Sequence, residues 1–191
     1  MKISDEKLVE QAKSGNSYAF GKLVKRYQNK VLFLAYDLVG NYNDAQDVAQ
    51  NTFLYAFRSI ARFQEKSSFS TWLYRITTNA AIDFQRSKKR KKTLSLNQKT
   101  SEREDERELI DTLIDKDKPF DERYQELDLK NIIEQTTAKL PPQQRAAFVL
   151  KYFNNQPTDE IAKILKCDPV TVRGHILRAS LKIRKLLKDE Q

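Results

Sequence analysis

The chain has 191 residues, with 35 lysines and arginines against 26 aspartates and glutamates, and a formal net charge of +9. One cysteine excludes an internal disulfide, and with a single histidine there are too few ligands for a structural zinc site, so we expect no metal and no other cofactor. The longest run without a charged residue has ten residues, Val48 to Phe57, against the roughly 20 apolar residues of a membrane-spanning helix. We therefore do not expect a membrane protein. Acidic residues near the start, where a secretory signal would be apolar, predict a cytoplasmic location.

Two helices are predicted near the start of the chain. Ser4 is placed to cap a short helix that stops at Ser14–Gly15, and Asn16 is placed to cap a longer one. Apolar residues in the longer segment follow the spacing of three and four that gives a helix one apolar face. Gly40 then stands where the end of that helix needs a left-handed residue.

Two further helices and a basic segment follow. Asn43 is placed to cap a helix whose apolar stripe ends at Ile60, and Ser70 to cap a helix that continues into residues 86–100. A polar stretch from Arg62 to Ser68 separates the two. Residues 86–100 carry seven basic and no acidic side chains. Such a run is either a solvated helix end or linker, or a patch that contacts phosphates, and charge alone does not decide between them. We predict one helical domain over residues 1–90.

The second half of the chain predicts a linker and another helical domain. Residues 91–120 are charged and polar, which is typical of a flexible linker, and residues 101–140 carry 7 basic against 13 acidic side chains. Because no useful length alternates with a period of two, we predict an all-α fold with two small helical domains, the second over residues 121–191. Its helices are expected over residues 121–139, from Pro141–Pro142 to Phe153, and over residues 158–166 and 169–188.

The last two predicted helices have the geometry of a helix-turn-helix. They are joined by a short turn, and the second is basic. Ile161, Ala162 and Leu165 from the first helix, and Val172 and Ile176 from the second, are expected in the core. An ordinary packed helical hairpin has the same spacing and remains the alternative. The outward positions, which are candidates for contacts in the major groove, are Val170, Thr171, Arg173, Gly174, His175 and Arg178.

Two groups of motifs, in a fixed order, carry a resemblance to a known family. The first domain contains DAQDVAQNTF from Asp44, then AFR, then SFSTWLYRITTN from Ser68, and the second contains LPPQQR, EIA and TVR. Over about residues 8–95 and 122–188 the chain resembles the sigma factors of bacterial RNA polymerase, in particular the extracytoplasmic-function (ECF) group of the sigma-70 family. The resemblance implies sigma region 2 at residues 1–90 and sigma region 4, a winged-helix-like helix-turn-helix domain, at residues 121–191. The chain departs from the family at Pro157, where a serine cap is usual, and at Lys166, where the turn usually has glycine.

The resemblance also implies roles for particular residues. The third helix docks on core RNA polymerase through Asp44, Asp47, Gln50 and Asn51. The loop before the fourth helix captures a flipped base of the minus-ten element, which needs aromatic walls and polar edges. Plain core packing is the alternative for the aromatic residues, and for Phe69 and Trp72 it is at least an equal one. Asp83 is unusual on a DNA surface and is expected to orient a neighbouring arginine. The implied minus-ten contacts are Phe63, Ser67, Ser68, Trp72, Arg75, Asn79, Asp83, Arg86, Lys88 and Lys89.

The expected function is that of a sigma factor without enzymatic activity. It binds core RNA polymerase, recognises and opens minus-ten DNA with its first domain, and reads the minus-thirty-five element with its second. The expected partners are core polymerase, promoter DNA in duplex and single-stranded form, and an anti-sigma factor. One rival is a regulator that binds duplex DNA as a dimer through the helix-turn-helix alone, which leaves the first-domain motifs unexplained. The other is a helical nuclease, which would want carboxylates or histidines gathered around a metal.

Overall fold

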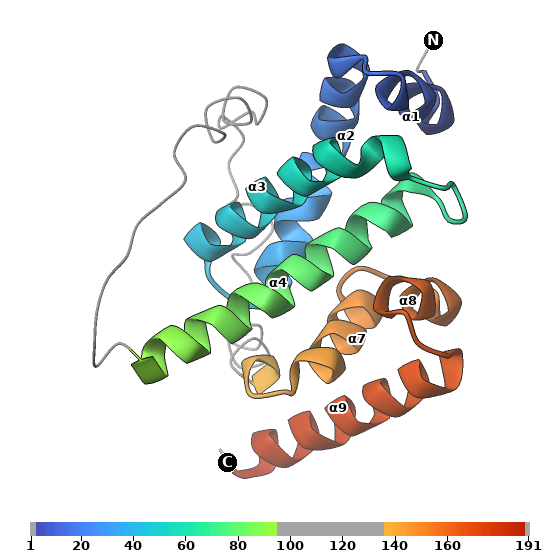
Figure 1. Ribbon diagram of the computed structural model, residues 1–191. Coiled ribbons are helices and arrows are strands. Elements are labelled where there is room, and N and C mark those ends of the chain that lie inside the picture. Colours follow the sequence, from blue (N-terminus) through green and yellow to red (C-terminus); the bar gives the residue numbers. More distant parts are fainter. Residues whose placement is uncertain (1–2, 95–135, 190–191) are drawn as a thin grey trace.

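The computed structural model describes residues 3–94 and 136–189, and every regular element in these ranges is a helix (Figure 1). The predicted all-α fold is therefore confirmed. The predicted linker and most of the helix predicted over residues 121–139 lie outside the described residues. None of the described helices is long and apolar enough to cross a membrane.

The N-terminal unit, residues 3–94, contains α1 (Asp5–Lys13), α2 (Ser17–Val39), α3 (Tyr42–Ser59), a short 3-10 helix (Ile60–Arg62) and α4 (Phe69–Leu94). The C-terminal unit, residues 136–189, contains α7 (Pro142–Tyr152), α8 (Thr158–Leu165) and α9 (Pro169–Asp189).

The first two helices begin and end as the sequence predicts. The Ser4 hydroxyl accepts a hydrogen bond from the Lys7 amide at 3.4 Å, and the Asn16 side chain accepts one from the Ala19 amide at 3.1 Å. Gly40 ends α2 in the left-handed conformation, with φ of +75°. Each of these ends is marked locally by one residue of the right type.

The caps of α3 and α4 differ from the prediction by two residues each. Asn41, not Asn43, caps α3: its side chain accepts from the Asp44 amide at 3.1 Å, because the left-handed Gly40 reverses the chain at once and leaves Asn41 extended. Ser68, not Ser70, caps α4: its hydroxyl accepts from the Thr71 amide at 3.1 Å. Either asparagine and either serine suits a cap, so composition alone cannot choose between them.

One apolar core holds the N-terminal unit together. It gathers the apolar faces of α1 to α4 around large, fully buried side chains such as Leu23, Phe53 and Leu73. The Asp5 carboxylate accepts hydrogen bonds from Arg26 and Tyr27, which fixes α1 on α2. The core thereby sets the angle between α3 and α4, the two helices that carry most of the predicted site.

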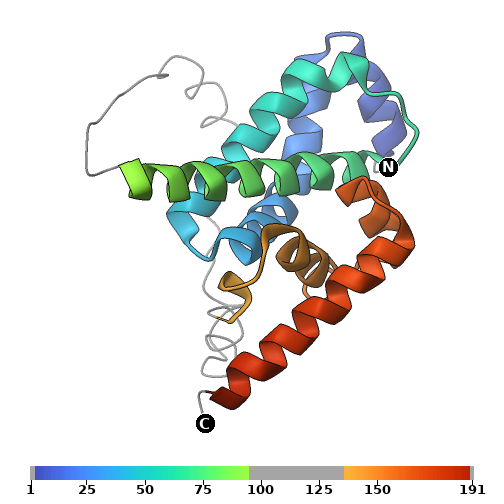
Figure 2. The same ribbon diagram turned by 60° about the horizontal axis from the view of Figure 1, so that its bottom comes forward.

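The two units pack directly against each other. A second apolar cluster joins Leu38 of α2 and Tyr74 of α4 to Leu150 of α7 and Ile161 of α8. In both views α4 lies between α3 on one side and the C-terminal helices on the other (Figures 1 and 2). A smaller cluster of Leu140 with the C-terminal half of α9 completes the C-terminal unit. The two units predicted from the sequence are thus in contact, which no sequence pattern indicated.

Candidate nucleic-acid interface

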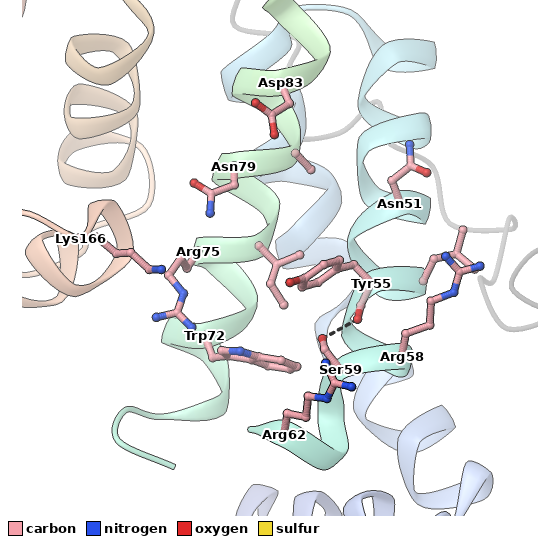
Figure 3. A pocket seen from close by; sticks show the side chains of 13 residues that line it. Asn51, Tyr55, Arg58, Ser59, Arg62, Trp72, Arg75, Asn79, Asp83 and Lys166 are labelled. Carbon is pink, nitrogen blue, oxygen red and sulfur yellow. Dashed lines mark hydrogen bonds between the residues drawn. The ribbon is translucent and has the colours of Figure 1, made fainter. Parts of the chain in front are cut away.

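A groove runs between α3 and α4 (Figure 3). Its volume is about 790 Å³, within the roughly 300–1,000 Å³ usual for ligand sites. One wall has residues spaced by four, three and four, and the other by three, four and four, so each set shares one helix face. The wall that begins on α3 contains Asn51, Tyr55, Arg58 and Arg62, and the wall on α4 contains Trp72, Arg75, Asn79 and Asp83.

The groove is basic. Arg58, Arg62 and Arg75 line it together with Lys166, which comes from the turn between α8 and α9, against a single carboxylate, that of Asp83. In Figure 3 Lys166 and Arg75 lie on the same side of the groove. Clustered cations in a concave surface concentrate the electrostatic attraction for phosphates. The groove therefore suits a nucleic-acid backbone.

Aromatic side chains form the floor and one rim of the groove. Trp72 is only 7% exposed and packs against Phe63, at 4.8 Å between ring centroids, and against Phe69, at 5.7 Å. Phe63, a predicted base-stacking wall, is itself 7% exposed in the core. Tyr55, by contrast, is 60% exposed at the rim. Of the aromatic side chains at this groove, Tyr55 is therefore the one best placed to stack on an unpaired base.

The loop before α4 is tied down at two points, Glu65 and Ser68. The Ser68 hydroxyl accepts from the Thr71 amide and lies 2.7 Å from the Thr71 hydroxyl, so its hydrogen-bonding capacity is largely used within the chain. Ser67 is half-buried. Glu65 has a left-handed backbone, with φ of +55°, and its carboxylate pairs with the Lys13 ammonium of α1 at 2.5 Å. The loop is thus held by α1 as well as by α4.

The predicted reading face of α4 is exposed from Asn79 onward. Asn79 is exposed and Arg75 half-buried. The Asp83 carboxylate lies 3.6 Å from the Arg86 guanidinium. Of the two arginines on this face, Arg75 and Arg86, it is therefore Arg86 that lies within ion-pairing distance of Asp83. The side chain of Lys89 lies outside what the structure describes.

The C-terminal unit forms the predicted helix-turn-helix. Ile161, Ala162 and Val172 are buried between α8 and α9, as the sequence predicts. Lys166 takes the left-handed conformation in the turn, with φ of +52°, a position at which glycine would be unstrained. No side chain caps the start of α8, which follows Pro157 directly. The serine cap that is usual in the family is therefore missing here, and no neighbouring residue replaces it.

The N-terminal half of α9 presents most of its predicted contacts to solvent. A Cβ at Gly174 would lie 3.5 Å from the Arg178 guanidinium, so that side chain folds over the glycine. His175 is half-buried, and its buried Nδ1 has no hydrogen-bond partner within the described residues. Burial, and then the charge of Arg178, lower the pKa of His175 below its ordinary value. The exposed positions are Val170, Thr171, Arg173 and Arg178.

Both units match known families along the chain. Residues 23–91 match Sigma-70 region 2, and residues 130–183 match Sigma-70, region 4. The ECF RNA polymerase sigma factor SigW of Bacillus subtilis is 35% identical over 189 residues, which cover 99% of this chain and all of SigW. The chain belongs to the ECF group of the sigma-70 family. The ECF RNA polymerase sigma-E factor of Haemophilus influenzae is also similar, at 36% identity over 178 residues that cover 93% of this chain and 92% of the relative.

Solved sigma factors share the fold of this sigma factor. The structure of CnrH in complex with the cytosolic domain of CnrY superimposes with a TM-score of 0.66 and 26% identity, over 98% of this chain and 99% of CnrH. The sigma factor RpoE of Bartonella quintana, solved with the anti-sigma factor NepR, has the same fold, with a TM-score of 0.63 and 20% identity over 90% of this chain and 98% of RpoE. As a member of its family, the protein directs promoter-specific initiation of transcription by RNA polymerase.

The predicted polymerase-binding residues lie along one side of α3. Asp47 and Asn51 are exposed, and Asp44 and Gln50 are half-buried. The Asp44 carboxylate pairs with the Lys88 ammonium of α4 at 2.5 Å. The fold of the sigma factor thus joins one predicted polymerase contact to one predicted DNA contact.

Four charged or aromatic residues of the groove escaped the sequence reasoning. Tyr55, Arg58 and Arg62 continue the spacing of Asn51 by four, three and four residues, and this signal could have placed them on the same face. Lys166 has no such signal, because it reaches the groove only through the packing of the two units.

Proposed function

We propose that this sigma factor binds unstacked bases of the minus-ten element in the groove between α3 and α4. The observation that carries the proposal is the combination, in one concave surface, of three arginines with an exposed aromatic ring. Arg58, Arg62 and Arg75 attract the backbone, Tyr55 stacks on a base, and the Asn79 amide offers both a donor and an acceptor to a base edge. Phe63 and Trp72 support the groove from below, while Ser67 and Ser68 shape the loop at its end.

The minus-thirty-five element is assigned to α9. Arg173 and Arg178 project from the first turns of this helix, where side chains reach the base edges and phosphates of the major groove. Thr171 adds a hydroxyl and a methyl group, and Val170 an apolar surface suited to a thymine methyl. Because its pKa is lowered, His175 is a neutral group here and not a phosphate-binding cation.

Core polymerase is assigned to the side of α3 that carries Asp44, Asp47, Gln50 and Asn51, and Asn51 also lines the groove. We assign sigma region 2 to residues 1–90 and sigma region 4 to residues 121–191, with residues 91–120 as linker. The protein acts in the cytoplasm and performs no covalent chemistry. An anti-sigma partner is part of the proposal, supported by the family resemblance and by the complex of CnrH, 26% identical, with the cytosolic domain of CnrY.

Two tyrosine variants test the groove. Holoenzyme reconstituted with Tyr55→Ala should bind a single-stranded minus-ten oligonucleotide roughly tenfold more weakly, since stacking contributes about 1–3 kcal/mol per base. Tyr18→Ala is the matched control, because Tyr18 is 72% exposed on α2 and does not line the groove. Affinity for core polymerase is measured in parallel, by fluorescence anisotropy.

Two results would contradict the proposal. In one, the two tyrosine variants bind the oligonucleotide equally well. In the other, Tyr55→Ala loses core polymerase and not the oligonucleotide, which places Tyr55 on the polymerase surface. Protection of duplex promoters by the protein without polymerase would favour a free-standing helix-turn-helix regulator.

A further inference from the structure

The short helix α1 lies against the loop before α4, residues 63–68. In both views it stands beside the end of α3 and the start of this loop (Figures 1 and 2), and it packs against the 3-10 helix that leads into the loop. No residue of α1 lines the groove between α3 and α4. None of the residues assigned above to DNA or to polymerase lies on α1 either. Its contacts with the loop are therefore not explained by a direct contact with either partner.

The first contact of α1 is an ion pair with a strained residue of the loop. The Lys13 ammonium, in the last turn of α1, lies 2.5 Å from the Glu65 carboxylate. Glu65 has a left-handed backbone, with φ of +55°, which is unfavourable for any residue with a Cβ and is more often taken by glycine or asparagine. A turn alone would be formed better by glycine. The carboxylate that reaches α1 therefore accounts for a glutamate at this position, and the surrounding contacts keep the strained backbone in place.

The second contact is a series of hydrogen bonds that leads from α1 to the cap of α4. The Tyr27 hydroxyl of α2 donates to the Asp5 carboxylate of α1 and also hydrogen-bonds with Ser70. The Ser70 hydroxyl lies 2.9 Å from that of Ser68, the residue that ends the loop and caps α4. Burial, and then the hydrogen bond to Asp5, raise the pKa of Tyr27 above its ordinary value, so the hydroxyl keeps its proton at neutral pH. Asp5 is thus connected to Ser68 through two hydroxyl groups.

Aromatic packing connects the loop to the floor of the groove. Phe63 begins the loop and Phe69 follows its end, and their rings pack against Trp72, with centroid distances of 4.8 Å and 5.7 Å. The Tyr27 ring packs edge-on against Phe69, at 5.4 Å. Trp72 in turn lines the groove. A shift of the loop therefore disturbs the packing of Trp72, since both neighbouring rings belong to the ends of the loop.

We propose that α1 is the positioning element of the minus-ten site. Lys13 holds the middle of the loop through its ion pair, and Asp5 holds the end of the loop through the series of hydroxyl groups. A loop that is ordered before the base arrives binds it better than a loop that has to be ordered on binding. Lys13 and Asp5 therefore affect which bases are accepted, and not how strongly all DNA is attracted. The effect on bases rests on the proposed function of the groove, whereas the hold of α1 on the loop does not.

A charge exchange tests the effect on base capture. Holoenzyme with Lys13→Glu, with Glu65→Lys or with both changes is measured against two oligonucleotides, a single-stranded minus-ten sequence and a scrambled sequence of the same composition. The ratio of the two affinities should fall roughly threefold in each single variant and return to within about twofold of wild type in the double variant, as expected for an exposed ion pair. A change in general attraction to phosphates alters both affinities alike and cancels in the ratio. Lys7→Glu is the matched control, because it makes the same charge change on α1 at an exposed side chain for which no ion pair is seen in the described part of the chain.

Fluorescence of the free, full-length protein tests the hold on the loop without DNA. Trp72 is the only tryptophan of the chain, so the emission reports its surroundings alone. Acrylamide should quench Trp72 more readily in Lys13→Glu and in Glu65→Lys than in wild type or Lys7→Glu, and the double variant should return to the wild-type value. Circular dichroism checks that helicity is retained.

A pair of tyrosine variants tests the series of hydroxyl groups. Tyr27→Phe removes the hydroxyl and keeps the ring on Phe69, so it should raise the quenching of Trp72 and lower the ratio of the two oligonucleotide affinities, with core affinity unchanged. Tyr74→Phe is the control, since Tyr74 is likewise 7% exposed or less but belongs to the apolar cluster on the other side of α4. Tyr74→Phe should leave the ratio as it is in wild type.

Separate outcomes overturn the hold on the loop and its role in base capture. Equal quenching of Trp72 in Lys13→Glu and Lys7→Glu, or a double variant that is no closer to wild type than the single ones, overturns the hold. Altered quenching with an unchanged affinity ratio overturns the positioning role. An equal loss on both oligonucleotides also overturns it, because Lys13 then acts on the DNA backbone through its charge. The quenching contains no DNA, so a failure of the groove assignment appears in the experiment with Tyr55→Ala and leaves the quenching results as they are.

Discussion

The two surfaces assigned to DNA are built in different ways. The groove between α3 and α4 is concave, takes its side chains from two helices and combines arginines with the exposed ring of Tyr55. The N-terminal half of α9 is one convex helix face with Arg173 and Arg178 and no aromatic side chain. A concave surface with a stacking platform suits bases that have left the duplex, whereas a convex helix suits the major groove of intact DNA. The comparison therefore predicts that damage to the first surface affects strand opening and damage to the second affects sequence choice.

The largest effect is expected from removing the centre of the first surface. The double variant Arg75→Ala with Asn79→Ala removes one charged and one amide contact and should cost about 3 kcal/mol in open-complex formation, a factor of more than 100. Permanganate reactivity of thymines near −10 measures the opening. A template that is already unpaired at the minus-ten element should still be bound more weakly, because the lost contacts are made with unpaired bases. Normal binding of the unpaired template would show that α4 acts before melting, and that the two surfaces do not differ in the way proposed.

A smaller and more selective effect is expected on α9. Arg173→Ala should cost about 1–3 kcal/mol at one base pair of the minus-thirty-five element and little at others. Lys88→Ala, on the basic end of α4, should instead weaken all promoters alike and reduce the salt dependence of binding by about one unit of slope. A panel of promoters with single base changes, measured at two salt concentrations, separates the two behaviours. Equal losses on every promoter in both variants would remove Arg173 from the base-reading role.

Local residue types predicted most of the secondary structure and little of the tertiary arrangement. Ser4, Asn16 and Gly40 fixed the ends of their helices because each acts within one turn. The caps at Asn41 and Ser68 were misplaced because asparagine or serine occurs twice within a few residues, and only the packed backbone selects between them. Burial of Phe63 and the place of Lys166 in the groove depend on contacts between segments far apart in the chain, which spacing along one helix does not encode.

The turn of the helix-turn-helix offers an effect of about 1 kcal/mol on stability. Lys166 has a left-handed backbone, which costs an ordinary residue about 1–2 kcal/mol relative to glycine. Lys166→Gly should therefore raise the free energy of unfolding of the C-terminal unit by about 1 kcal/mol, part of the gain being offset by the greater freedom of glycine in the unfolded chain. Denaturant titration followed by circular dichroism measures this gain. Lys166→Ala is the control, because it removes the ammonium but keeps the Cβ, and so separates the backbone effect from the loss of a cation in the groove. If Lys166→Ala raised the free energy of unfolding as much as Lys166→Gly, the charge and not the backbone conformation would be responsible.

The smallest effect is a dependence of stability on pH that belongs to the second surface alone. The pKa of His175 is lowered by burial and by Arg178, and its unpartnered Nδ1 would become a buried donor on protonation. The folded state therefore binds this proton less readily than the unfolded state, whose histidine titrates near 6.5. The contribution of neutral His175 is complete above that value and is lost as the pH falls through it toward the lower folded pKa. Between pH 7.5 and pH 5.5, wild-type protein should lose more thermal stability than His175→Gln, which cannot be protonated. Parallel losses in the two proteins would show that His175 is solvated like an ordinary surface histidine and that α9 is packed less closely around it than the structure shows.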